Sequence, residues 1–391
     1  GGGGGGPVNR VVTASSARAT MRSTEHLVRW LAVALWAASS MAWAAEPYHL
    51  EVVREVNTVL TLEQTLTLAA GDVRQLDLYM AQPPSLPLAQ ANVARRWWLN
   101  TTAIDPQRAA CADPVDQPFG STILTYRLPY ALREKPATIK VTTFARLLNT
   151  RVAVGGPKPE QTTAITPGAR DMALAETPAL DFSRPEFQAW YRANGLHQRP
   201  AEETDRTYVA RAGLAMAKQF RAAHTDAGAD GWRASAVVTR RQLDNQPIAL
   251  DCVPTSVLLA AIMRAPKESG AAIPAILCSG WLVDQRITKT PVGHTLVRYW
   301  DSTAQAWLWA DMTGALRPVG DTTRPEPTLE AVYALINQRK DVLIEEFGGG
   351  IRPEPGQPVY DAIGPLTYTY RWRGNPPTLS AVRSVSYTEL P

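Results

Sequence analysis

The chain has 391 residues, of which 45% are apolar and 19% are charged. This composition is typical of a folded globular protein, and the length suits two domains. The formal net charge is only +4, and no basic stripe is present, so the sequence gives no support for nucleic-acid binding.

Residues 1–44 have the pattern of an N-terminal extension followed by a signal peptide. A glycine run opens the chain, and a basic start at Arg22 and Arg29 precedes an apolar run over residues 30–38. That run is too short to span a bilayer as a permanent helix. Ala42-Trp43-Ala44 has the small-x-small pattern that signal peptidase recognises, so we expect cleavage after Ala44 and an exported protein, periplasmic or secreted. The alternative is an uncleaved N-terminal anchor.

Residues 45–160 contain short segments of alternating apolar and polar residues, separated by clusters of Pro, Gly and Asp. The clearest of these segments are residues 50–56, 59–62, 76–80, 122–126 and 138–144. Strands at such spacing predict an antiparallel β-sandwich. Residues 161–182 follow a Pro-rich stretch and are predicted to be a linker.

Residues 183–345 mix helical and strand patterns and predict a second, α+β domain. An apolar run over residues 257–264 predicts a buried helix. Strands are expected around 274–283, 294–300 and 306–312, and a further helix over 326–340. Residues 346–391 are predicted to be C-terminal strands or an extension.

Cys252 stands at the start of the predicted buried helix. Pro254 is compatible with a helix only in the first turn, where its missing N–H costs nothing, so it places Cys252 at the helix N-terminus. The partial positive charge of a helix N-terminus stabilises a thiolate, which is the reactive form of cysteine. Cys252 is therefore the candidate nucleophile.

A nucleophilic thiol needs a nearby base, and His294 is the histidine that starts a predicted strand. The segment from Asp301 to Ala304 predicts a tight turn into the next strand. A two-residue loop there would place His294 directly opposite Asp311, while a longer loop would slip the register by one or two residues. Cys252, His294 and Asp311 are thus predicted to form a catalytic triad.

The same segments resemble the transglutaminase-like superfamily, of the exported bacterial type. The matching motifs, over about residues 200–315, are Asp251-Cys252 before a helix ending in Met263-Arg264, Ala272-Ile273-Pro274-Ala275 with Gly280-Trp281, Gly293-His294, and Trp309-Ala310-Asp311-Met312-Thr313. The resemblance implies a papain-like core with a Cys nucleophile, a His base and an orienting Asp, often preceded by a β-sandwich. The expected fold class is therefore α+β, with an N-terminal antiparallel β-sandwich and a transglutaminase-like domain.

The sequence departs from the family pattern at several positions near these motifs. Leu250 replaces a Gly, residues 267–270 are an insertion, Thr295-Leu296 replaces Ala-Trp, and Met312 replaces Pro. None of these changes removes a catalytic atom.

Two residues are candidates for the second oxyanion donor, beside the backbone amide of Cys252. Gln246 lies six residues upstream, a spacing that resembles the papain-type glutamine. Its alternative is an exposed loop residue. Trp232 is the other candidate, since animal transglutaminases use an upstream Trp in this role.

The predicted loop from Val283 to Val292 joins the Gly280-Trp281 strand to the His294 strand, so both its ends are expected beside the site and the loop is predicted to gate access to Cys252. Its basic residues Arg286 and Lys289 are candidates for binding an acidic substrate segment, and the alternative is a solvated connector.

The predicted activity is that of a thiol hydrolase, a peptidase or amidase that acts on a peptide or protein substrate through an acyl-enzyme. Acyl transfer to an amine and a catalytically silent scaffold for a cell-envelope partner are the alternatives. No ligand spacing for a metal and no nucleotide-binding motif is present, so no cofactor is expected. Three cysteines are an odd number for an exported chain. Cys278 is predicted to be a buried core thiol, while whether Cys111 and Cys278 pair is left open, as is the oligomeric state.

Overall fold

The computed structural model describes residues 48–68, 73–108, 122–127, 137–155, 164–223, 232–244, 248–336, 341–347, 368–374 and 379–391. These residues belong to one unit, Pro47–Pro391. The predicted signal peptide lies outside the described residues. The predicted fold class, α+β with antiparallel sheets, is confirmed.

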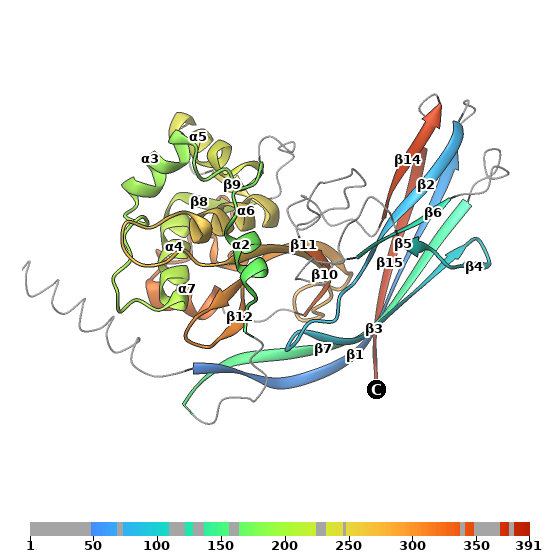
Figure 1. Cartoon of the computed structure of the whole chain (residues 1–391), viewed down its shortest axis with the longest axis horizontal. Coiled ribbons are helices and arrows are strands. Elements are labelled where there is room, and N and C mark those ends of the chain that lie inside the picture. Colours follow the sequence, from blue (N-terminus) through green and yellow to red (C-terminus); the bar gives the residue numbers. More distant parts are fainter. Residues whose placement is uncertain are drawn as a thin grey trace, which may run out of the picture. The chain divides into compact units, whose positions relative to one another are not determined.

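The strands before residue 155 form a β-sandwich with two antiparallel sheets (Figure 1). One sheet has the order β15-β1-β7-β3-β4 and the other the order β14-β2-β6-β5. The strands are β1 (Tyr48–Leu68), β2 (Val73–Gln82), β3 (Gln90–Leu99), β4 (Thr102–Ile104), β5 (Gln107–Arg108), β6 (Thr122–Arg127) and β7 (Ala137–Val154), joined by β14 (Tyr368–Gly374) and β15 (Leu379–Leu390). Alternate residues of β7, such as Ile139 and Val141, are buried, as the period of two predicts.

The C-terminal strands are integral to this sandwich. Strand β15 pairs with β1 from Leu390 opposite Asn57 to Leu379 opposite Leu68, and β14 pairs with β2. The α+β part of the chain therefore lies, in sequence, between two groups of sandwich strands.

The α+β part contains a four-stranded antiparallel sheet with the order β12-β11-β10-β13. Its strands are β10 (Ala275–Leu282), β11 (Val292–Asp301), β12 (Ala306–Ala310) and β13 (Val342–Phe347). The short strands β8 (Phe220–Ala222) and β9 (Ile248–Leu250) pair in parallel. The helices are α2 (Pro167–Leu174), α3 (Pro185–Ala193), α4 (Asp205–Gln219), α5 (Ala234–Asp244), α6 (Cys252–Arg264) and α7 (Leu329–Ile336), with a 3₁₀ turn, η3 (Thr313–Ala315).

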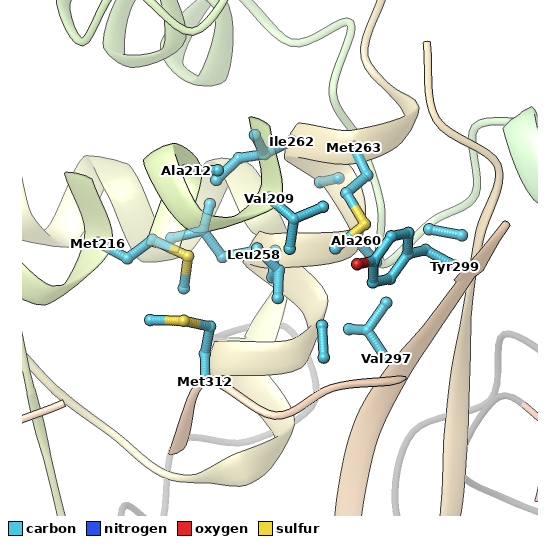
Figure 2. Packing of buried hydrophobic residues seen from close by; sticks show 14 of the residues in the cluster. Val209, Ala212, Met216, Leu258, Ala260, Ile262, Met263, Val297, Tyr299 and Met312 are labelled. Atoms are coloured by element: carbon cyan, nitrogen blue, oxygen red, sulfur yellow. The ribbon is translucent and has the colours of Figure 1, made fainter. Parts of the chain in front are cut away.

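Helix α6 is the centre of the main hydrophobic core. All its residues from Val253 to Arg264 are buried, which matches the apolar run in its sequence. Figure 2 shows Leu258 and Ile262 among side chains of α4 and of β11, including Val209 and Val297. Helix α6 is thus held between α4 and the sheet.

The segment that was expected to be a linker, residues 161–182, contains helix α2. Thr166 caps this helix by accepting the N–H of Ala169 at 3.2 Å, and Pro167 occupies the first turn. Ala169 and Ala173 are buried in a cluster with residues of β10, β11 and β13. The prolines of this region favoured a linker in the prediction, but Pro167 occupies the first turn of a helix.

Candidate active site

The N-terminus of α6 leaves few of its backbone amides free. The carboxylate of Asp251 accepts the N–H of Val253 at 3.0 Å, and its carbonyl oxygen accepts the N–H of Thr255 at 3.3 Å. Pro254 has no N–H to donate. Asp251 and the proline thus account for the positions from Val253 to Thr255, and the N–H of Cys252 is the remaining amide of the first turn.

Cys252 is the first residue of α6 and is partly exposed, at the margin of the main core. This is the location that Pro254 predicts. The capping role of Asp251 was not predicted, although an Asp directly before a helix is a common cap.

The hairpin that carries His294 and Asp311 has the longer of the loops considered above. Asp301 pairs with Ala306, so residues 302–305 form the loop. The direct opposition that a two-residue loop would give does not occur, and the register slips by two residues, as expected for a longer loop. The Asp301 carboxylate accepts the N–H groups of Thr303 and Ala304 at 2.9 and 2.8 Å, and Gln305 closes the loop at φ 50°. These turn interactions favour four loop residues over two.

The two side chains nevertheless meet. A shift of two residues keeps both on the same face of the hairpin, whereas a shift of one would have separated them. His294 Nε2 lies 2.7 Å from Asp311 Oδ2, and both residues are 5% exposed. The other carboxylate oxygen of Asp311 accepts the N–H of Thr313 at 3.1 Å, which fixes its orientation.

The surroundings of His294 favour its protonated form. Burial lowers the pKa of the imidazole, but the charge of Asp311 and hydrogen bonds with Asp311 and Cys252 outweigh the burial and raise the pKa from 6.5 to about 9. Since Nε2 faces Asp311, Nδ1 is the nitrogen that remains for the thiol. An imidazolium beside a cysteine favours the thiolate.

The structure describes only one of the two candidate oxyanion donors. Gln246 lies outside the described residues. Trp232, like Cys252, packs against the main core, and its Nε1 is buried without a hydrogen-bond partner among the described residues. Such a buried donor is costly unless a ligand or substrate uses it.

The loop between β10 and β11 ends close to His294, because β11 begins at Val292, two residues before it. The guanidinium of Arg286 donates to the buried carboxylate of Asp284 from Nε at 2.8 Å and from Nη2 at 2.5 Å. This bidentate pair directs the charge of Arg286 towards Asp284, while Lys289 is exposed. The gating role of the loop and its preference for acidic substrates stay predictions.

The remaining cysteines have other surroundings. Cys278 on β10 is a free, fully buried thiol, and burial raises its pKa to about 12. Cys111 lies outside the described residues. Within the described part of the chain, no group of three or more His, Cys, Asp or Glu side chains could hold a metal ion. No described helix is long and apolar enough to cross a membrane.

Comparison with known proteins supports the fold. No protein-family model matches the sequence, and no curated protein matches it significantly. A crystal structure of a protein from Cytophaga hutchinsonii, described as a "putative cysteine protease", matches with a TM-score of 0.52 over 88% of this chain and 93% of that chain. The two chains share a fold. At 12% identity, the likeness extends to the fold alone.

Proposed function

We propose that the protein is an exported thiol hydrolase of the transglutaminase-like kind, with Cys252 as nucleophile, His294 as base and Asp311 as the orienting carboxylate. The observation that carries the proposal is the buried 2.7 Å contact between His294 and Asp311. Cys252, at the start of a buried helix, is close enough to the same imidazole to help raise its pKa.

The reaction starts from the thiolate of Cys252 beside the imidazolium of His294. The sulfur attacks the carbonyl carbon of an amide, and a C–S bond forms. When the C–N bond breaks, His294 gives its proton to the leaving amine from Nδ1, which leaves a thioester. Water then attacks the thioester, the imidazole takes its proton, and the acid is released with the thiolate restored. Asp311 holds the ring through Nε2 in every step.

The negative charge that forms on the carbonyl oxygen needs donors. The N–H of Cys252, at the start of α6, is the first donor that we propose. The buried Nε1 of Trp232 is our preferred second donor, because its lack of a partner in the described structure suits a group that bonds only the reacting substrate.

Acyl transfer is the second candidate, since the same thioester can pass to an amine in place of water. The choice depends on access of water to the intermediate. A silent scaffold for an envelope partner is the third candidate, and it would not require the paired imidazole and carboxylate.

A substrate screen tests the proposal. Peptide and isopeptide substrates, with and without an added primary amine, would be incubated with wild type and with Cys252→Ala. We expect release of an acid, or of an amide when the amine is present, by wild type and no product from Cys252→Ala, which should keep its fold. Turnover by a pure Cys252→Ala preparation would exclude Cys252 as the nucleophile.

A further inference from the structure

Three buried hydroxyl side chains lie between α6 and the sheet, close to the proposed triad. They are Ser256 on α6, Ser279 on β10 and Thr295 on β11, at 3%, 0% and 1% exposure. Ser256 Oγ donates to the carbonyl oxygen of Thr295 at 3.0 Å, and the hydroxyls of Ser279 and Thr295 are 3.1 Å apart. Burying a hydroxyl group in an apolar core costs free energy unless the group is hydrogen-bonded, and the hydrogen bonds among these three residues offset that cost.

The position of Ser256 relates it to both reacting groups. Ser256 follows Cys252 by four residues on α6, so the two lie on the same helix face one turn apart. Thr295 directly follows His294 on β11. The bond from Ser256 to Thr295 therefore joins the helix that carries the thiol to the strand that carries the imidazole.

Apolar side chains also join α6 to β11 in the core. Figure 2 shows Leu258 of α6 near Val297 of β11, within the main core. Apolar packing is non-directional and depends mainly on buried area, so it holds the helix on the sheet without fixing its rotation or its position along its own axis. A hydrogen bond is directional and restricts both. At the far end of α6, Arg264 Nε donates to the carbonyl oxygen of Ala275 on β10 at 2.7 Å. Ser256 adds such a bond to β11 one turn from Cys252.

We infer that Ser256 is a positioning residue, whose hydrogen bond to the Thr295 carbonyl sets where the Cys252 thiol lies relative to the His294 imidazole. The inference rests on the proposed function, because it concerns the geometry of that site. Ser256 touches no substrate and acts through Cys252. A displacement of about 1 Å between reacting groups can lower a rate by about a hundredfold.

The chain provides a matched control for this role. Ser256→Ala and Ser279→Ala each remove one buried hydroxyl beside Thr295, but only the Ser256 hydroxyl bonds across from α6 to the backbone of β11. Both variants should lose similar thermal stability. They should differ in the reactivity of Cys252.

The experiment measures the rate constant for alkylation of Cys252 by iodoacetamide between pH 5 and 9. Wild type should react at low pH, as a thiolate next to an imidazolium does. We expect Ser256→Ala to lose about tenfold or more of the rate at pH 6 and to shift its profile to higher pH, because the ion pair is loosened. Ser279→Ala should stay within about twofold of wild type.

The results distinguish a failure of the proposed function from a failure of the positioning role of Ser256. A wild type without low-pH reactivity would refute the proposed function itself. A reactive wild type with the same profile in folded Ser256→Ala, or with equal shifts in both alanine variants, would overturn the positioning role alone. If Ser256→Ala failed to fold, Ser256→Thr would replace it: this variant keeps the hydroxyl and should retain the wild-type profile, and a shifted profile in the folded protein would contradict the inference.

Discussion

At the residue scale, His294 and Asp311 should differ in how much activity depends on them. His294 transfers the proton, while Asp311 orients the ring and stabilises its charge. We expect His294→Ala to lower turnover by on the order of a thousandfold or more. The fold-loss of turnover in Asp311→Asn should be roughly a hundred times smaller than that in His294→Ala. Turnover numbers for both variants on the same substrate check this. Equal or reversed losses would mean that the roles are wrongly assigned.

The raised pKa of His294 also predicts a pH dependence of stability. The folded state favours the protonated imidazole, so this contribution is fully present below pH 6.5, the ordinary value, and is lost as the pH rises through about 9. Between pH 6 and 9.5, the free energy of unfolding of wild type should fall by up to about 3 kcal/mol more than that of His294→Gln. Urea unfolding of both proteins across this range measures the difference. Parallel pH profiles would contradict the assigned pKa.

Local signals in the sequence predicted where the candidate site residues stand, but not how they are held. Pro254 placed Cys252 at the helix start because a proline is tolerated only there. The sequence left the hairpin register open, because the length of the loop depends on the backbone N–H groups that Asp301 accepts within it. The hydrogen bond of Ser256 was not predicted, since the partner of a single buried hydroxyl group in an apolar helix depends on tertiary structure.

At the scale of elements, two glycines differ in what an added side chain would meet: strand backbone at Gly280 and side-chain atoms at Gly213. A Cβ at Gly280 on β10 would lie 1.9 Å from the carbonyl oxygen of Leu343, because β13 approaches there at a bulge. A Cβ at Gly213 on α4 would lie 2.6 Å from the sulfur of Met312, in the flexible part of a side chain, and 3.0 Å from Cγ1 of Val332, so it meets side chains and no backbone.

Gly280→Ala should therefore lower the free energy of unfolding by roughly 3 kcal/mol or more, since strand backbone must move. Gly213→Ala should cost much less, because Met312 can change rotamer and alanine favours the helix by about 1 kcal/mol. Urea unfolding of the two variants compares them directly. Losses of similar size would show that β13 is free to move.

The strands of the sandwich were predictable from alternation, and α6 from its apolar run. Helix α2 was not, because its cap and its proline resemble a linker until Ala169 and Ala173 are seen buried against the sheet. The pairing of β14 and β15 with strands of the sandwich could not be predicted either, since the alternation of residues in a strand does not indicate which strand it pairs with.

At the scale of the whole unit from Pro47 to Pro391, the sandwich and the α+β part share a core. Trp281 and Val283 at the end of β10 and Leu343 of β13 belong to the same buried cluster as sandwich residues such as Leu60 and Ile139.

Polar contacts join the same parts. The buried side chain of Gln90 bonds both the N–H and the carbonyl oxygen of Ile344, each at 2.8 Å, and Tyr48 donates to Asp301 at 2.7 Å. We expect residues 47–391 to unfold in one calorimetric transition, and a fragment of residues 164–347 to be insoluble because it would expose Trp281 and its neighbours. Two separate transitions would contradict a shared core.

The most direct test of the proposed triad is which cysteine reacts. Iodoacetamide at limiting concentration and pH 6, followed by intact-mass analysis and peptide mapping, would be applied to wild type and to His294→Ala. We expect one label on Cys252 of wild type, none on the buried Cys278, and loss of most of the Cys252 label in His294→Ala, because the imidazolium that favours the thiolate is gone. Equal labelling of Cys252 in both proteins, or a preference for another cysteine, would contradict the triad.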